Sequence, residues 1–216
     1  MSARRKVPVR RAVPTRHGAA EKAVTEFLAG CGIPRLEGEL RRTPARVARV
    51  WNEDLLSGYR EDPARLLRPL PTRRTGDVVA VREIPFISVC IHHLLPFHGR
   101  VHVAYVPSGT ITGVSRLAAL VRCLSRRLQL QEVLTREIAE AIQTHLRPEG
   151  AVCVIEATHL CMTGRGERSA GAYVVTSAFT GCLERDSRRR LPALALLGVG
   201  ARPGRRRAGR SHPPRN

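Results

Sequence analysis

Five side chains that can bind a transition metal or transfer protons lie in two short segments of the sequence. They are Cys90, His92 and His93 in SVCIHHLLPF, and His159 and Cys161 in EATHLCM. Zinc prefers thiolate and imidazole ligands, and a zinc site with three protein ligands keeps one position open for chemistry. The spacing therefore predicts a catalytic metal site formed by Cys90, His93 and Cys161, with His92 and His159 as acid–base groups beside it. From the pattern alone, a small buried cysteine and hydrogen-bonded core histidines are the alternative interpretation.

Longer segments around these residues extend the pattern. They read SVCIHHLLPFHGRVHVAYVP, GVSRLAALVRCLSRRLQLQEVLTREIAEAI and EATHLCMTGRGERSAGAYVVTS. In this order they resemble the GTP cyclohydrolase I family. The resemblance is collinear from about Glu21 to about Arg185 and includes RRTPARVARVW near the start, whereas both ends of the chain lie outside it.

The resemblance implies an enzyme that hydrolyses GTP, opens its imidazole ring and forms 7,8-dihydroneopterin triphosphate and formate, the first step of folate and pterin biosynthesis. Water must add at C8, and a zinc ion would lower the pKa of its bound water to about 7. His92 would protonate N7. His159 would be the second acid–base group, on the same side as Cys161 if both lie on one strand. The unperturbed histidine pKa of about 6.5 suits both tasks.

The resemblance also implies how guanine is recognised. Glu132 in LQLQEVL corresponds to the carboxylate that accepts hydrogen bonds from the guanine N–H groups, and Gln131 lies beside it. A carboxylate paired with this edge discriminates against adenine. Without the resemblance, Glu132 is a solvated acid at a helix start, where the helix dipole favours negative charge.

Four further residues correspond to the ribose and phosphate contacts of the family. Ser115 and Arg116 in GVSRLA fall at an expected helix N-terminus, which is suited to binding anions. Arg46 in TPARVA and Arg165 in MTGRGE fall on phosphate-binding positions. Taken singly, each of these two is an ordinary surface arginine in an arginine-rich chain.

Three positions depart from the family pattern. Ile91 stands where the family has glutamate, Ala119 where it has arginine, and Val133 where it has arginine. The first change removes a carboxylate near the metal, and such changes can cost 10–100-fold in metal affinity or activity. Two alternatives therefore stay open: a paralogue acting on a different guanine compound, and a non-catalytic purine or nucleic-acid binder. The intact metal and acid–base residues favour an enzyme.

The composition indicates one cytoplasmic enzyme domain. The chain has 216 residues, 43% of them hydrophobic, which is enough for a core that buries roughly two-thirds of its surface. It contains no apolar run long enough for a membrane span, and its basic start has no apolar segment typical of a secretion signal. Six cysteines, some in metal-like spacing, indicate a reducing compartment.

The net charge of +19 is concentrated at the two ends of the chain. Residues 1–16 and 201–216 each hold six basic residues and no acid, which leaves +7 for residues 17–200. We expect two disordered basic tails around a catalytic domain at 17–200. The tails could bind polyanions non-specifically through phosphate neutralisation, although solvated ends without a function are the simpler interpretation.

Apolar periodicity and turn residues predict an α+β order. Helices are expected at 17–30, at 43–56 with Thr43 as N-cap, at 115–124 with Ser115 as cap, and at 131–145; strands are expected at 77–89, 100–106, 151–158 and 172–183. Two strands, two helices and two strands agree with what the resemblance implies, a tunnelling fold. In that fold an antiparallel sheet carries two long helices on one face. The resemblance further implies N-terminal helices, an oligomeric barrel, a toroidal homodecamer and active sites at subunit boundaries.

Overall fold

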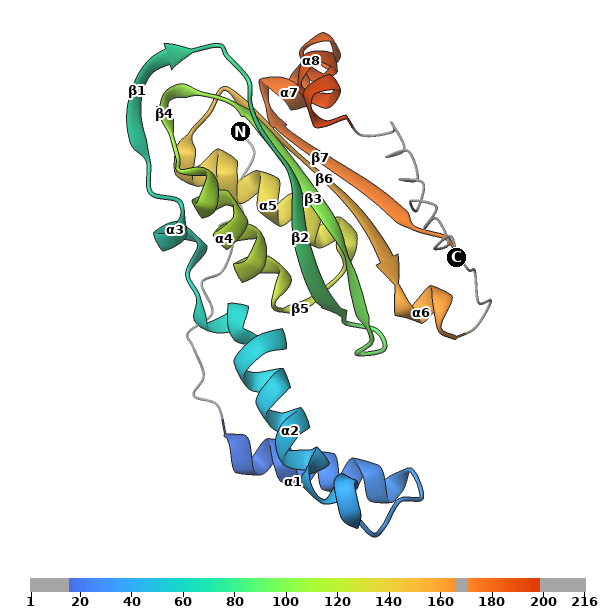
Figure 1. Ribbon diagram of the computed structural model, residues 1–216. Helices are drawn as coiled ribbons and strands as arrows, with labels where there is room; N and C mark the ends of the chain where they lie inside the picture. Colours follow the sequence, from blue (N-terminus) through green and yellow to red (C-terminus); the bar gives the residue numbers. More distant parts are fainter. Residues whose placement is uncertain (1–15, 166–170, 199–216) are drawn as a thin grey trace, which may run out of the picture.

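The computed structural model describes residues 16–165 and 171–198, and a five-stranded sheet forms their centre (Figure 1). The strand order is β5-β2-β3-β6-β7, and only the short β5 runs parallel to its neighbour. The bounds are β2 Val79–Cys90, β3 Pro96–Val106, β5 Leu128–Gln129, β6 Gly150–His159 and β7 Val174–Gly181. The four main predicted strands are confirmed, with ends shifted by a few residues.

Two helices, α4 (Val114–Ser125) and α5 (Gln131–Leu146), cover one face of this sheet (Figure 1). Successive strand residues point to opposite faces, so Phe97, Val101 and Tyr105 of β3 all reach the core between sheet and helices. Leu134, Ile138 and Ile142 of α5, spaced four apart, are fully buried in the same core. The predicted layer of two long helices on one sheet face is confirmed.

The opposite sheet face is covered at one end by α7 (Cys182–Arg185) and α8 (Ser187–Leu197), which pack on Ala104 and Val152. The sequence-based strand at 172–183 is wrong at its end. Gly181 has φ +59°, a left-handed conformation that turns the chain into α7.

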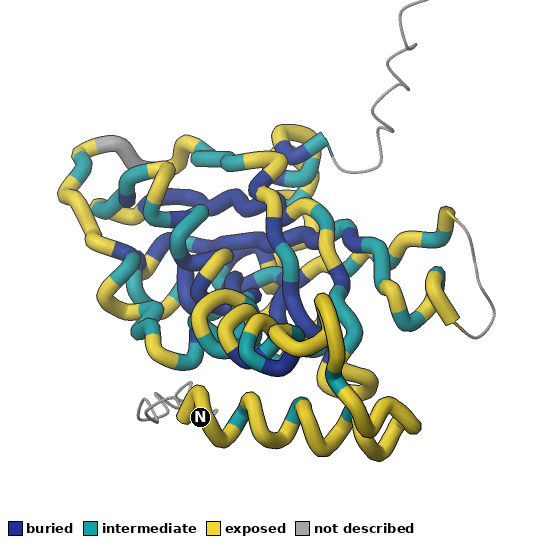
Figure 2. Tube along the Cα trace, turned by 60° about the horizontal axis from the view of Figure 1, so that its bottom comes forward, coloured by how far each residue is buried: buried dark blue, intermediate teal, exposed yellow. Residues whose placement is uncertain are grey.

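Four helical segments before the sheet form an N-terminal arm that extends away from it (Figure 1). They are α1 (His17–Gly30), the 3-10 helix η1 (Gly38–Arg42), α2 (Thr43–Arg49) and the π-helix η2 (Val50–Leu55). The predicted helix at 43–56 is confirmed in extent, but Arg42 and not Thr43 occupies its N-cap position. Within the described part of the chain α1 buries none of its residues, and Phe27 is 68% exposed (Figure 2).

Two 3-10 or α-helical turns, η3 (Ser57–Arg60) and α3 (Pro63–Leu66), link the arm to the body. A second sheet follows, in which β1 (Leu70–Thr75) pairs with β4 (Ser108–Ile111). It was not predicted. Ser115 lies second in α4, whose N-cap position is Gly113, so its predicted capping role is wrong.

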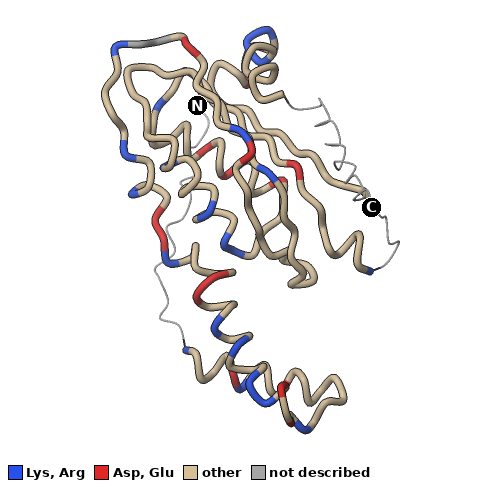
Figure 3. The backbone as a smooth tube through the Cα atoms, viewed as in Figure 1, with Lys and Arg blue, Asp and Glu red and all other residues tan. Residues whose placement is uncertain are grey.

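Among residues 16–165 and 171–198, no helix is long and apolar enough to cross a bilayer. Both acidic and basic residues occur along the arm (Figure 3). The two predicted basic tails lie outside the described residues, apart from Arg16.

Candidate metal and active site

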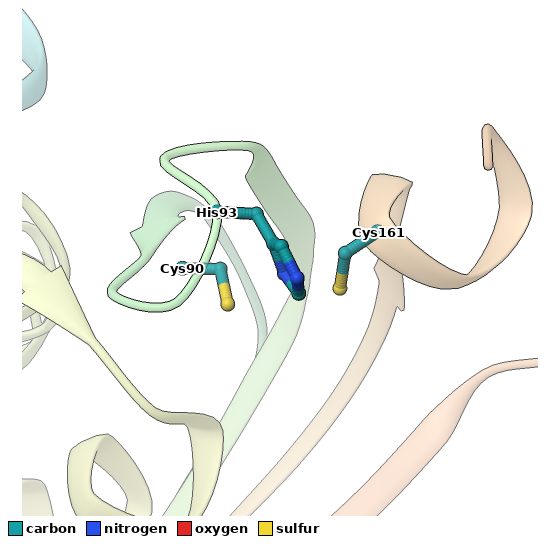
Figure 4. Close-up of side chains that lie close together, drawn as sticks. All are labelled: Cys90, His93 and Cys161. Atoms are coloured by element: carbon teal, nitrogen blue, oxygen red, sulfur yellow. The ribbon is translucent and has the colours of Figure 1, made fainter. Parts of the chain in front are cut away.

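Cys90, His93 and Cys161 converge at one end of the sheet and point toward one another (Figure 4). Their ligand atoms all lie within 4.8 Å of one another. Cys90 is the last residue of β2, and Cys161 lies in α6 (Leu160–Thr163), the short helix after β6. The condition that His159 and Cys161 lie on one strand is not met, because β6 (Gly150–His159) ends before Cys161. A turn into α6 still brings the two side chains together.

A tight turn returns His93 over Cys90. The Leu94 N–H donates to the Cys90 carbonyl and the Cys90 N–H donates to the Leu95 carbonyl, each at 2.9 Å. Leu94 has φ +56°, a conformation that non-glycine residues seldom adopt. The backbone of Leu94 is therefore strained next to the candidate ligand His93, and such strain is typical of functional sites.

The donor set fits a borderline-soft cation such as zinc. Burial and, after it, the neighbouring Cys90 sulfur raise the pKa of the Cys161 thiol, while the Arg165 guanidinium opposes this shift. The Cys90 sulfur thus disfavours the thiolate form of Cys161, and a divalent cation between the two sulfurs would remove that penalty. Two sulfurs and one imidazole are the ligand types that zinc selects.

His159 lies beside the three candidate ligands in a constrained position. Its Nε2 is 2.7 Å from Oε1 of Gln131, and its Nδ1 is 4.0 Å from Sγ of Cys161. Its ring stacks on Phe97, the residue opposite it on β3, with centroids 4.6 Å apart and planes 7° from parallel. Burial lowers the pKa of His159, and the nearby Glu132 carboxylate partly opposes this.

His92 directly precedes the candidate ligand His93 and is exposed. Its ring meets that of His93 edge-on, at 6.2 Å between centroids. Each of the two predicted acid–base histidines thus lies beside a candidate ligand: His159 is partly buried next to Cys161, and His92 is exposed to solvent next to His93.

The start of α5 reaches the same end of the sheet, because β5 pairs Gln129 with Cys90 immediately before the helix begins. Glu132 is exposed there, while Gln131 is 1% exposed and contacts His159. Neither the burial of Gln131 nor the stacking of Phe97 on His159 was predicted from the sequence. Only the pairing register of β3 against β6 could have indicated the stacking of Phe97.

The predicted phosphate-binding residues are not all brought to this place. Arg165 is close enough to influence Cys161. Ser115 and Arg116 lie at the start of α4, whose other end leads to β5, so the helix separates them from Cys90 by about 15 Å along its axis. Arg46 lies in the N-terminal arm, 3.6 Å from a Glu39 carboxylate oxygen.

A cysteine and histidine site with three ligands, flanked by two further histidines, defines a class of metal-dependent enzymes. The model of the family GTP cyclohydrolase I matches residues 20–198, and this chain belongs to that family.

Individual proteins with similar sequences support the family match. The GTP cyclohydrolase 1 of Desulforamulus reducens is 46% identical over 179 residues, covering 82% of this chain and 95% of that protein. The GTP cyclohydrolase 1 of Pelotomaculum thermopropionicum is 45% identical, covering 82% and 94%, and that of Mycobacterium marinum is 43% identical, covering 82% and 89%. Among solved structures, the archaeosine synthase QueF-Like in the apo form covers 50% of this chain and 97% of its own, at 17% identity and a TM-score of 0.41.

Proposed function

We propose that this protein is a GTP cyclohydrolase I, which hydrolyses GTP to 7,8-dihydroneopterin triphosphate and formate. One observation carries the proposal: in a chain of this family, Cys90, His93 and Cys161 place their ligand atoms within 4.8 Å of one another, next to His159. A protein that only binds purines would not need an open metal position flanked by two histidines. The free state of all six cysteines is consistent with a reducing cytoplasm, where we place the reaction.

Zinc is the proposed metal, held by the same three residues. When bound, it supplies Lewis acidity that makes water a usable nucleophile near neutral pH. His92, exposed on the ligand turn, is placed to give a proton to N7 of the purine. His159, next to Cys161, would move a proton during ring opening and the later ribose rearrangement.

Glu132 is proposed to bind the guanine edge. It is exposed at the start of α5 and close enough to His159 to influence its pKa. A carboxylate accepts hydrogen bonds from two adjacent guanine N–H groups, whereas adenine presents a mismatched edge. In this proposal the base lies beside the metal site with its imidazole ring toward the ligands.

The triphosphate is proposed to bind Ser115, Arg116, Arg46 and Arg165, with the first two supplied by a neighbouring copy of the chain. The position of Ser115 and Arg116 at the far end of α4 supports this division. So does the exposure of apolar side chains on the segments that carry the site residues or adjoin them, which a second chain would cover: Ile91, Leu94, Val133, Met162 and Tyr173. We propose a toroidal homodecamer in which the catalytic domain spans residues 17–200.

The departures from the family pattern motivate a second candidate. Ile91 and Val133 are 51% and 45% exposed at the rim of the site, and Ala119 lies one helical turn from Arg116. Their apolar side chains would weaken the contact with a triphosphate. The alternative is therefore a paralogue that acts on a guanine compound with fewer phosphates.

The test is to incubate zinc-loaded protein with GTP and to follow formate release together with pterin fluorescence after oxidation. His92→Ser and His159→Ala should retain zinc and lose most of the activity, roughly 10²–10⁴-fold for an acid–base group. His98→Ala is the matched control, because His98 is exposed on β3 and aligned with Ile87 away from the ligands. Release of formate from guanosine or GDP but not from GTP would favour the second candidate, and release from none of them would reject both.

A further inference from the structure

Gln131 uses every polar atom of its side chain inside the protein. Its Nε2 donates toward the carbonyls of Ile155 and Val174, at 3.1 and 3.0 Å, and toward Oγ1 of Thr176 at 3.1 Å. Its Oε1 lies 2.7 Å from Nε2 of His159. The residue is 1% exposed, so a substrate could reach its amide only by displacing these partners.

The partners determine which way the Gln131 amide points. Backbone carbonyls only accept hydrogen bonds, so the atom that faces Ile155 and Val174 must be the NH₂ group. The atom that faces His159 is therefore the amide oxygen, which can only accept. It follows that Nε2 of His159 carries a hydrogen.

Two threonines complete the same network. The Thr135 hydroxyl donates to the Gln131 backbone carbonyl at 2.6 Å, and it lies 2.6 Å from the Thr176 hydroxyl. The only hydroxyl hydrogen of Thr135 is donated to the Gln131 carbonyl. The Thr176 hydroxyl must therefore donate to the Thr135 oxygen, and it accepts from the Gln131 amide with a lone pair. All donors in this ring of contacts have acceptors, so the orientation of Gln131 is consistent at each step.

A proton on Nε2 leaves the lone pair of neutral His159 on Nδ1. That atom lies on the side of Cys161, at 4.0 Å from its sulfur. Phe97 stacks flat against the ring and opposes a flip that would exchange the two nitrogens. The ring is thus fixed with one nitrogen toward the protein and the other toward the metal ligands.

We propose that Gln131 is a positioning residue, which holds His159 as the Nε2–H tautomer so that Nδ1 is the atom that exchanges a proton in the reaction. This inference rests on the proposed function of the site. It gives Gln131 a role through His159 in place of the guanine contact that the family resemblance implies. Glu132 then carries the recognition of the base.

Kinetics separate these two roles. Gln131→Met keeps the length of the side chain and removes both polar atoms. It should retain zinc, leave KM for GTP within about twofold and lower kcat roughly 10–100-fold, which is less than the full 10²–10⁴-fold contribution of an acid–base group. Thr176→Val is the matched control, since it loosens the same network without touching His159; its kcat should stay within about threefold of wild type.

The tautomer can be read directly without turnover. Solid-state ¹⁵N NMR of histidine-labelled, zinc-loaded protein at about pH 8.5, with His159→Ala to assign the signal, should show His159 protonated at Nε2 and bare at Nδ1. In Gln131→Met both tautomers should be populated. A proton on Nδ1 in the wild-type protein would overturn the proposal. So would a Gln131→Met protein with a raised KM and normal kcat, or equal losses of kcat in Gln131→Met and Thr176→Val. If the wild-type protein releases no formate from GTP, the proposed function fails while the NMR result still decides the tautomer.

Discussion

Replacing Ala119 with arginine should strengthen the binding of GTP. Ala119 lies three residues after Arg116 and three before Arg122 on α4, and it is partly exposed. Residues three apart are neighbours on a helix surface, so the new guanidinium would extend the charge of Arg116 along one face. This is the face that we propose to bind the triphosphate.

The expected gain exceeds the expected cost. A hydrogen bond to a charged group contributes about 1.5–3 kcal/mol, and about 1.4 kcal/mol already changes an equilibrium tenfold. Two new like-charge pairs, with Arg116 and Arg122, would each cost roughly 0.2–0.5 kcal/mol of folding stability. This repulsion lowers the free energy of unfolding of the free protein, and the negative charge of bound phosphate would offset it. We therefore expect KM for GTP to fall about tenfold with kcat little changed.

The assay is steady-state formate release over a range of GTP concentrations, at low and at moderate salt. If the new guanidinium contacts a phosphate, the fall in KM for GTP should be larger at low salt, because salt screens exposed charge pairs. Unchanged or weaker use of GTP by Ala119→Arg, together with efficient turnover of a guanine compound without the triphosphate by the wild-type protein, would refute the reasoning. Alanine at this position would then reflect a different substrate.

Three further predictions concern the metal, the link to the arm and a buried histidine. Cys161→Ala should lose both bound zinc and turnover, because affinity depends on every deprotonated ligand; one zinc per subunit measured in that variant would contradict the assignment. Gly58→Ala should lower the melting temperature by several degrees, since its Cβ would meet the Cys123 carbonyl oxygen, whereas Gly18→Ala, with open space around its Cβ, should not. Burial lowers the pKa of His102, so the folded protein binds its proton less readily than the unfolded chain. The stability is therefore complete above about pH 6.5 and declines as the pH falls toward the lowered value; between pH 7.5 and 5.5 the melting temperature should drop more in the wild-type protein than in His102→Gln.

Apolar periodicity was sufficient to predict the helices and strands that bury one face. Leu134, Ile138 and Ile142 at helical spacing predicted α5, and alternation in VHVAYV predicted β3. The convergence of Cys90, His93 and Cys161 could also be predicted, because they are unusual types in unusual spacing. In each case the residues themselves carry the signal.

The features that escaped prediction depend on contacts between distant segments. The apolar face of α1 looks like a core face in the sequence, yet Phe27 stays exposed because the arm extends away from the sheet. The tautomer of His159 depends on Gln131, which is 28 residues away along the chain. The helical turn α6 that holds Cys161 was not predicted, because nothing in THLCM marks it. Such features require the register of paired strands.

The placement of Arg116 at the far end of α4 and of Cys161 at the metal-site end of the sheet has a genetic consequence under the proposed assembly. A chain without its metal ligand could still lend a phosphate contact to its neighbour, and a chain without Arg116 could still hold zinc. Two separately inactive variants, Cys161→Ala and Arg116→Ala, would then regain part of their activity when they are expressed together. Each active site would combine residues of two chains. A defect in one chain would then be compensated wherever the neighbouring chain supplies the intact residue.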